Sequence, residues 1–124
     1  MNMEETKKEA TKTEVVTDLE VANKLIKLYQ SAKDRNIDFD LTLNKVRQLL
    51  QVKSCYYTGV PFEEDGKYAR SIDRVDSDKG YIDDNVVACT VDINGKKANL
   101  TNEEIEMLYT KLKQWHKNKT AKAK

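Results

Sequence analysis

The chain has 124 residues, of which 39% are hydrophobic and 35% are charged, and its formal net charge at pH 7 is +1. This size suits one small domain, and no run approaches the ~20 apolar residues that a membrane-spanning helix needs. Two cysteines are too few for a disulfide framework, so we expect an intracellular, cytoplasmic protein.

The first third of the sequence predicts a leader followed by two helices. Residues 1–17 are rich in Glu and Lys and offer little to bury, so we expect a disordered leader that lacks the apolar run of a signal peptide. Residues 18–54 are expected to form an N-terminal helical part. Its first helix begins with Asp18 as N-cap and ends at the breakers in "DRNID", and its second helix follows Asp40.

The central segment predicts strands and loops. "KSCYYTGVPF" contains a glycine and the only proline of the chain, which exclude a helix there. In "EEDGKYARSIDRV" we expect a hairpin, with a turn at Asp65 and Gly66 and a strand from Ala69 to Val75. "DSDKGYIDDN" is expected to be a loop in which Gly80 permits the chain to reverse. "VVACTV" suits either a strand or the lead into a helix.

A clear start signal marks the last helix. Thr101 and Glu104 stand at the spacing of a capping box. An apolar stripe follows at helical intervals and is expected to lie in the core: Ile105, Leu108, Tyr109, Leu112 and Trp115. Residues 118–124 form a Lys-rich basic tail, whereas the segment 63–84 is acidic. This distribution suits a protein that holds a polyanion and binds a cation, although a solvated helix end alone explains the lysines at least as well.

Four polar residues of the central and following segments are spaced as in a nuclease motif. Asp73, Asn85, Asn94 and Lys97 stand 12, 9 and 3 residues apart, within "SIDRVD", "GYIDDNVV" and "NGKK". Together with "CYYTG" upstream and "LTNEE" downstream, this order resembles the HNH endonucleases, and phage-type members most. The resemblance implies an α+β fold with a small ββα-metal (HNH-like) core at residues 55–117, preceded by N-terminal helices and ending in a C-terminal helix.

The resemblance also implies a chemistry, the hydrolysis of DNA phosphodiester bonds with Mg²⁺ or Mn²⁺. It assigns the metal to Asp73 on a strand and Asn94 on the facing helix, whose oxygens are the hard ligands that Mg²⁺ prefers. It gives Asn85 the task of tying down the loop through side-chain-to-backbone hydrogen bonds. Lys97, one helical turn beyond Asn94, would contact phosphate as a point charge.

The zinc site that many HNH proteins possess does not match this sequence. It needs two C-x-x-C pairs, and the positions that correspond here are Cys55 with Thr58 and Thr90 with Ile93. Because only one of the four ligands is present, we expect no structural zinc. Packing would stabilise the fold instead, with Ile93 and its neighbours in the place of the metal. A disulfide between Cys55 and Cys89 is not expected in a reducing compartment.

The general base of the family also differs. It is the His directly after the strand Asp, and this chain has Arg74 there. Arginine stays protonated and has no acceptor, so it cannot take a proton from water. Candidate substitutes are Asp76, acting on metal-bound water, and a tyrosine, either Tyr57, Tyr68 or Tyr81. Alternatively, Arg74 would stabilise the phosphate while bulk hydroxide or the substrate supplies the base. A missing base lowers the rate by ~10²–10⁴-fold.

These residues have plain alternatives as well. Aspartates in "DSDKGYIDD" are common turn formers, and Asn94-Gly95 is a frequent hairpin turn. An EF-hand calcium loop fails, because Arg74 and Lys79 would occupy its first ligand position and its glycine position. Two other functions stay open: a catalytically impaired HNH-fold protein that binds nucleic acid or inhibits a host protein, and a helical adaptor without metal. DNA is the expected partner, a second copy of the chain or a host protein are further candidates, and for a phage protein the compartment is the host cytoplasm.

Overall fold

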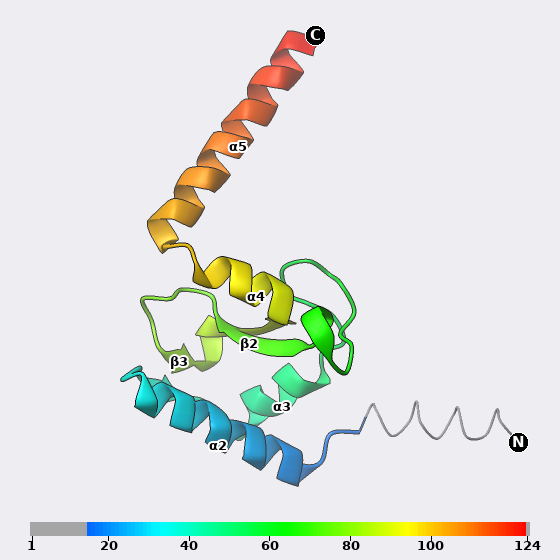
Figure 1. Ribbon diagram of the computed structural model, residues 1–124, viewed down its shortest axis with the longest axis vertical. Coiled ribbons are helices and arrows are strands. Elements are labelled where there is room, and N and C mark those ends of the chain that lie inside the picture. The colour runs from blue at the N-terminus through cyan, green and yellow to red at the C-terminus, as the bar shows by residue number, and fades with distance from the viewer. Residues whose placement is uncertain (1–14, 124) are drawn as a thin grey trace, which may run out of the picture.

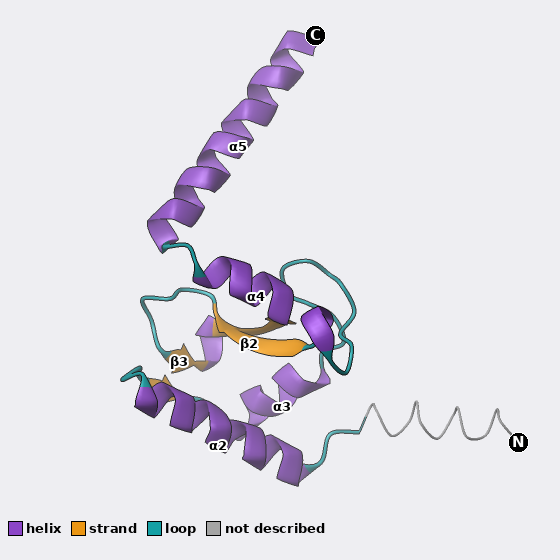
Figure 2. Ribbon diagram, viewed as in Figure 1, coloured by secondary structure: helices purple, strands orange, loops and turns teal. Residues whose placement is uncertain are grey.

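The computed structural model describes residues 15–123, so the leader expected at residues 1–17 lies outside it except for its last three residues. In chain order the helices and strands are α2 (Asp18–Asp34), β1 (Phe39–Asp40), α3 (Leu43–Gln51), β2 (Arg70–Arg74), β3 (Tyr81–Ile82), β4 (Val86–Thr90), α4 (Val91–Ala98) and α5 (Asn102–Ala123). Two short 3₁₀ turns, η1 (Gly66–Tyr68) and η2 (Asp83–Asn85), precede β2 and β4. The α+β class predicted from the sequence is confirmed (Figure 2).

Two strands form the centre of the fold. β2 pairs antiparallel with β4, with Ser71 opposite Cys89 and Asp73 opposite Val87. α4 lies on one side of this pair, and α2 and α3 lie on the other (Figure 1). Because side chains alternate between the two sides of a strand, Ile72 of β2 enters the core toward α2 and α3. Ser71 and Asp73 instead face α4, whose side chains they contact.

Both N-terminal helices begin at a threonine. Thr17 caps α2: its hydroxyl accepts from the Glu20 N–H at 3.1 Å, and its own N–H donates to the Glu20 carboxylate at 3.4 Å. The prediction of Asp18 as N-cap is wrong by one residue, because Asp18 lies in the first turn, where its charge favours the helix dipole. Thr42 caps α3, and its N–H and hydroxyl donate to Asp83 at 3.0 and 2.8 Å. These bonds fasten α3 to the central segment.

The prediction of a hairpin at Asp65 and Gly66 is wrong. Gly66, with φ at 81°, opens η1, and β2 pairs with β4 rather than with the segment before it. The glycine does mark a turn, since a positive φ favours glycine, but a local signal does not identify the strand's partner. Of the two alternatives for "VVACTV", the strand is confirmed as β4. Thr90 at its end caps α4 by accepting from the Ile93 N–H at 3.4 Å.

One hydrophobic core joins the N-terminal helices to the segment that resembles HNH proteins. Its buried residues come from both: Val21, Leu28, Ala32, Leu41, Val46, Leu49, Ile72, Tyr81, Val86 and Ala88. The short parallel pair of β1 and β3 adds to this junction. There a Cβ on Gly80 would lie 2.4 Å from the Asp38 carbonyl oxygen, so Gly80 serves close packing and not the chain reversal that we expected. Parts 18–54 and 55–117 therefore share a single core.

The last helix differs most from the sequence prediction. Its capping box is confirmed, since Thr101 N–H donates to Glu104 at 2.8 Å and the Glu104 N–H donates to the Thr101 hydroxyl at 3.1 Å. The helix then projects away from the body of the fold (Figure 1). Leu108, Leu112 and Trp115 are 53%, 58% and 54% exposed, so the prediction that the stripe is core is wrong. Helical periodicity identifies an apolar face, but it does not say what covers that face.

The C-terminal end of the described chain is helical. α5 runs to Ala123, so nearly all of the basic tail predicted at residues 118–124 belongs to this helix. Among the described helices, none combines the length and the apolar composition that crossing a membrane requires.

Candidate functional site

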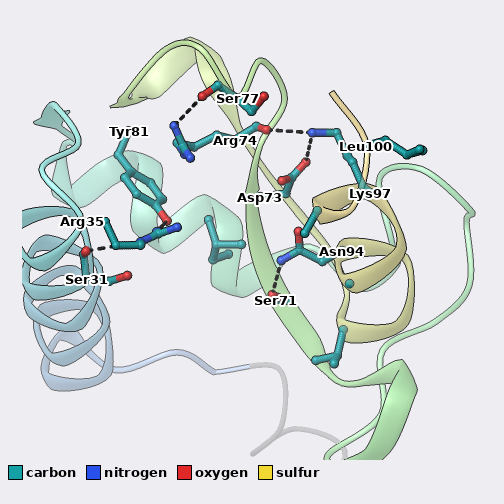
Figure 3. Close-up of a pocket in the computed structure, with 14 residues that line it drawn as sticks. Ser31, Arg35, Ser71, Asp73, Arg74, Ser77, Tyr81, Asn94, Lys97 and Leu100 are labelled. Carbon is teal, nitrogen blue, oxygen red and sulfur yellow. Dashed lines mark hydrogen bonds and ion pairs between the residues drawn. The ribbon is translucent and has the colours of Figure 1, made fainter. Parts of the chain in front are cut away.

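A pocket of about 670 Å³ opens between the end of α2, strand β2 and helix α4 (Figure 3). Its charged lining side chains are Arg35, Arg74, Lys97 and Asp73, so cations outnumber carboxylates. Serine hydroxyls and the Asn94 carboxamide complete the polar lining. A concave surface with this charge suits an anionic group such as phosphate.

Among the described residues that line the pocket, Asp73 is the only acid, and it is already paired. Its Oδ2 accepts the Tyr57 hydroxyl at 2.6 Å and lies 3.1 Å from the Lys97 Nζ. The side chains of Asp73 and Lys97 are 11% and 16% exposed. Lys97 Nζ also donates to the Arg74 carbonyl at 3.0 Å (Figure 3). The ion pair is therefore nearly buried and joins α4 to the end of β2.

Asn94 lies on α4 and not in the hairpin turn that Asn94-Gly95 alone suggests. Its Nδ2 donates to the Ser71 Oγ at 2.7 Å (Figure 3). Ser71 stands two residues before Asp73 on the same side of β2. This bond orients the carboxamide so that its oxygen faces away from Ser71. Asp73 and Asn94 thus line one pocket from two facing elements, as the HNH resemblance implies.

Two side chains of the pocket, Asp73 and Asn94, offer a carboxylate and a carboxamide oxygen that could bind a divalent cation. No three His, Cys, Asp or Glu side chains gather into a metal-binding group among the residues that the structure describes. One carboxylate and one carboxamide fit Mg²⁺, which keeps several waters and takes few protein ligands. The ammonium of Lys97 competes for the same carboxylate oxygen. Asp73 and Asn94 would therefore hold the ion, and Lys97 would have to give up its contact with Asp73.

Asn85 fastens the loop between β2 and β4. Its side chain is 5% exposed. The Oδ1 accepts from the Asp76 N–H at 3.0 Å, and the Nδ2 donates to the carbonyls of Asp76 and Gly80 at 3.1 and 2.9 Å. These are the side-chain-to-backbone bonds that the resemblance implies for this position. The loop is thereby fixed to the residue that precedes β4.

Arg74 also stabilises this loop. Its guanidinium donates to the carbonyls of Ser77 and Lys79 at 2.9 and 2.7 Å. It lies 5.5 Å from the centre of the Tyr81 ring. Because these two hydrogen bonds go to backbone carbonyls, Arg74 stabilises the loop. This structural role was not expected from the sequence, which suggested a phosphate contact only. The charge of Arg74 nonetheless lines the pocket.

Asp76, expected to assist as a base, points to α5. Its carboxylate accepts from the Asn102 Nδ2 at 2.7 Å and from the Asp78 N–H at 2.9 Å. The bond from Asp78, with a smaller contribution from Asn102, lowers the pKa of Asp76 below its usual value. A lower pKa makes the carboxylate a weaker base. Asp76 and Asn102 together anchor the first turn of α5.

The three candidate tyrosines differ in their surroundings. Burial, and then the hydrogen bond to Asp73, raise the pKa of Tyr57, so its phenol stays protonated and does not act as a base. Tyr81 is 5% exposed, lines the pocket and accepts a hydrogen bond from Arg35 (Figure 3). Tyr68 is in η1 and is not among the residues that line the pocket. Only Tyr81 of the three therefore lines the pocket.

Sequence reasoning missed two residues of this pocket, Arg35 and Ser71. Ser71 could have been found, because the alternation of a predicted strand places it beside Asp73. Arg35 lies in the segment that was recognised only as the end of the first helix. Its partner Tyr81 is 46 residues further along the chain, so no local pattern links the two.

Hydrogen bonds surround Cys55, where the resemblance would place a zinc ligand. Its sulfur accepts from the Thr90 N–H at 3.4 Å and from the Thr90 hydroxyl at 3.9 Å. Burial raises the pKa of this thiol, but donors from Thr58, Thr90 and Tyr57 outweigh burial and lower the pKa to about 7. Burial raises the pKa of the Cys89 thiol to about 12. Both cysteines are free thiols.

Part of the chain is similar to a phage protein. The chain is 38% identical over 77 residues to the uncharacterized 29.0 kDa protein in the dda-modA intergenic region of Enterobacteria phage T4. The match covers 60% of this chain and 31% of that protein, so the chain spans about a third of the relative's length. No protein-family model matches the chain. No solved structure matches it either.

Proposed function

We propose that this chain is an HNH-like, Mg²⁺-dependent endonuclease that hydrolyses phosphodiester bonds in DNA. The observation that supports the proposal is that Asp73 on β2 and Asn94 and Lys97 on α4 line one cationic pocket, while Asn85 ties down the adjoining loop. When bound, Mg²⁺ neutralises the charge that develops on the phosphate and on the leaving oxygen. The similarity to a phage T4 protein favours a phage origin, and hence action in the host cytoplasm.

Within this proposal, side chains of the pocket bind and orient the DNA backbone. Lys97 serves as a phosphate ligand once another cation neutralises Asp73. Arg35, the residue directly after α2, lines the pocket and binds a neighbouring phosphate of the same strand. Its guanidinium already donates to the Tyr81 hydroxyl and to the Ser31 carbonyl, so these contacts place it before DNA binds. A preplaced arginine binds phosphate with less loss of side-chain freedom.

The reaction is expected to be slow because the pocket lacks an efficient base. Arg74 cannot accept a proton. Asp76 is bound to Asn102 and has a lowered pKa. A missing base lowers the rate by ~10²–10⁴-fold, so we propose nicking over many minutes rather than rapid cleavage.

Nicking of supercoiled plasmid in the presence of Mg²⁺ or Mn²⁺ tests this function. Asp73→Asn should abolish nicking, because it removes the one carboxylate of the pocket. Asp92→Asn is the matched control: Asp92 lies in the first turn of α4, is paired with Lys96 at 3.3 Å, and is not among the residues that line the pocket. Nicking that survives in Asp73→Asn, or that is equally lost in Asp92→Asn, would refute the assignment.

Position 74 gives a second test of the nuclease. Arg74→His places an acceptor where the family has its general base, so the nicking rate should rise, by up to ~10²-fold. The variant also loses the two carbonyl bonds of Arg74, and thermal unfolding should therefore be measured beside activity. An unchanged rate in a folded variant would show that the reaction does not use this position.

A second function is favoured by the pairing of Asp73 with Lys97, since the carboxylate is neutralised without metal. In this alternative the chain is a catalytically impaired HNH-fold protein that binds nucleic acid or inhibits a host protein. Salt-dependent retention of DNA without nicking would support it. Loss of affinity in Arg35→Gln, with Lys33→Gln in the last turn of α2 as the control outside the pocket lining, would place the DNA in the pocket. If the chain neither nicks nor binds DNA, the hypothesis of a helical adaptor without metal is the one that remains.

A further inference from the structure

Helix α5 presents an apolar stripe that the rest of the described fold leaves exposed. Ile105, Leu108, Leu112 and Trp115 follow one another at intervals of three, four and three residues. This is the spacing of the seam of a coiled coil. Leu108, Leu112 and Trp115 are each more than half exposed, and the helix projects from the body of the fold (Figure 1). An exposed, contiguous apolar stripe is typical of a surface that binds a partner.

The charges along α5 indicate which partner fits. The first turns carry the acids Glu103, Glu104 and Glu106. The rest of the helix carries lysines and no acid, with Lys111, Lys113, Lys117 and Lys119 among the residues described. A parallel copy of this helix would place acids against acids and lysines against lysines. An antiparallel copy places the acidic start of each helix beside the basic end of the other, which is the favourable arrangement.

The apolar residues meet in the same antiparallel arrangement. If two copies of α5 cross with Thr110 at the centre, Ile105 of each faces Trp115 of the other, and Leu108 faces Leu112. All four layers of the seam are then apolar. The apolar spacing is compatible with this arrangement, and the charge pattern selects the antiparallel orientation over the parallel one.

We propose that α5 is a dimerisation helix, which pairs antiparallel with α5 of a second copy of this chain. The first turn of α5 is joined to the loop after β2, because Asn102 donates to Asp76 at 2.7 Å and to Asp78 at 3.2 Å, and accepts from the Ser77 hydroxyl at 3.2 Å. This inference uses no property of the proposed nuclease, so either can fail without the other.

Sedimentation velocity of the full chain, over a wide range of concentrations, tests dimerisation. We expect a concentration-dependent dimer, and Leu112→Glu should weaken association at least ~10-fold, since burying one unpaired charge exceeds the 1.4 kcal/mol that a factor of ten represents. Leu19→Glu is the control, because Leu19 on α2 is also exposed, at 71%, but lies outside the stripe. A chain that stays monomeric, or a Leu112→Glu variant that dimerises like the wild type, would overturn the proposal.

Disulfide cross-linking tests the orientation. Lys111→Cys lies next to the crossing point, so two antiparallel copies should cross-link at this position on mild oxidation. Ile105→Cys should not, because in that arrangement Ile105 faces Trp115. The natural thiols Cys55 and Cys89 are 3% and 0% exposed and give little background. Cross-linking of Ile105→Cys without cross-linking of Lys111→Cys would refute the antiparallel pair. If the chain is monomeric and Leu112→Glu lowers its retention of DNA, the stripe binds DNA and not a second copy.

Discussion

Lys97→Met tests the centre of the site, because it removes the ammonium from Asp73 and leaves a carboxylate that is 11% exposed. Two unit charges 3.1 Å apart attract by about 5 kcal/mol at an effective dielectric constant of about 20. Desolvation of both groups offsets most of this energy while the pair is intact. In the variant the acid remains buried without its cation, so we expect the free energy of unfolding to fall by about 2–4 kcal/mol. For a fold of this size the midpoint of thermal unfolding would drop by roughly 10–20 °C.

Thermal and urea unfolding followed by circular dichroism measure this loss. Lys96→Met is the matched control, because the Lys96 side chain is 70% exposed and pairs with Asp92 four residues before it on the same helix, and such pairs contribute about 0.3–0.5 kcal/mol. The double variant Asp73→Asn with Lys97→Met should recover part of the stability, since no charge remains to be buried. If Lys97→Met loses no more than Lys96→Met, the ion pair does not have the energetic role that its geometry indicates.

Mg²⁺ should act differently on these variants. A divalent ion bound to Asp73 takes over the task of the missing ammonium, so millimolar Mg²⁺ should raise the unfolding midpoint of Lys97→Met more than that of the wild type. The double variant should not respond, since it lacks the carboxylate. An equal response of all three proteins would argue against a metal at Asp73, whether or not the chain cuts DNA.

Three further predictions follow from the packing and the hydrogen bonds. Gly80→Ala should destabilise the fold by about 2–4 kcal/mol, because its Cβ would lie 2.4 Å from the Asp38 carbonyl oxygen. Gly95→Ala has open space around its Cβ and should instead stabilise α4 by about 0.5–1 kcal/mol. Urea titration that ranks the stabilities of the two variants in the opposite order would contradict this. Asn85→Ala should lower the free energy of unfolding by about 2–3 kcal/mol, since three hydrogen bonds of a buried side chain are lost, and amide exchange of the loop 75–80 should become faster; protection equal to that of the wild type would refute the role of Asn85. The pKa of Cys55 is about 7 in the folded chain and about 8.5 in the unfolded chain, so folding favours the thiolate. The free energy of unfolding should therefore rise by about 2 kcal/mol from below pH 7 to above pH 8.5. The difference in this free energy between the wild type and Cys55→Ala measures the effect, and a difference that does not change with pH would disprove it.

The sequence predicted the local features of the site better than its surroundings. Asn85 makes the loop bonds implied by the resemblance, and Asn94 lies on a helix that faces Asp73, because residue spacing along strand, loop and helix fixes these positions. Arg35 was not found, since its approach to the pocket depends on how α2 packs and not on any neighbour in sequence. The exposure of Trp115 was missed for a related reason: periodicity marks a face as apolar, and the arrangement of the whole fold decides whether that face is covered.

The core shared by both halves of the chain limits how the fold can be divided. A fragment beginning at residue 55 would contain every residue of the proposed motif, but Ile72, Val86 and Ala88 would lose the helical layer beneath them. In this chain α2 and α3 support these strands by packing against them. The unit formed by β2, β4 and α4 is consequently not expected to fold by itself. If it were grafted onto another protein, α2 and α3 would have to be transferred with it.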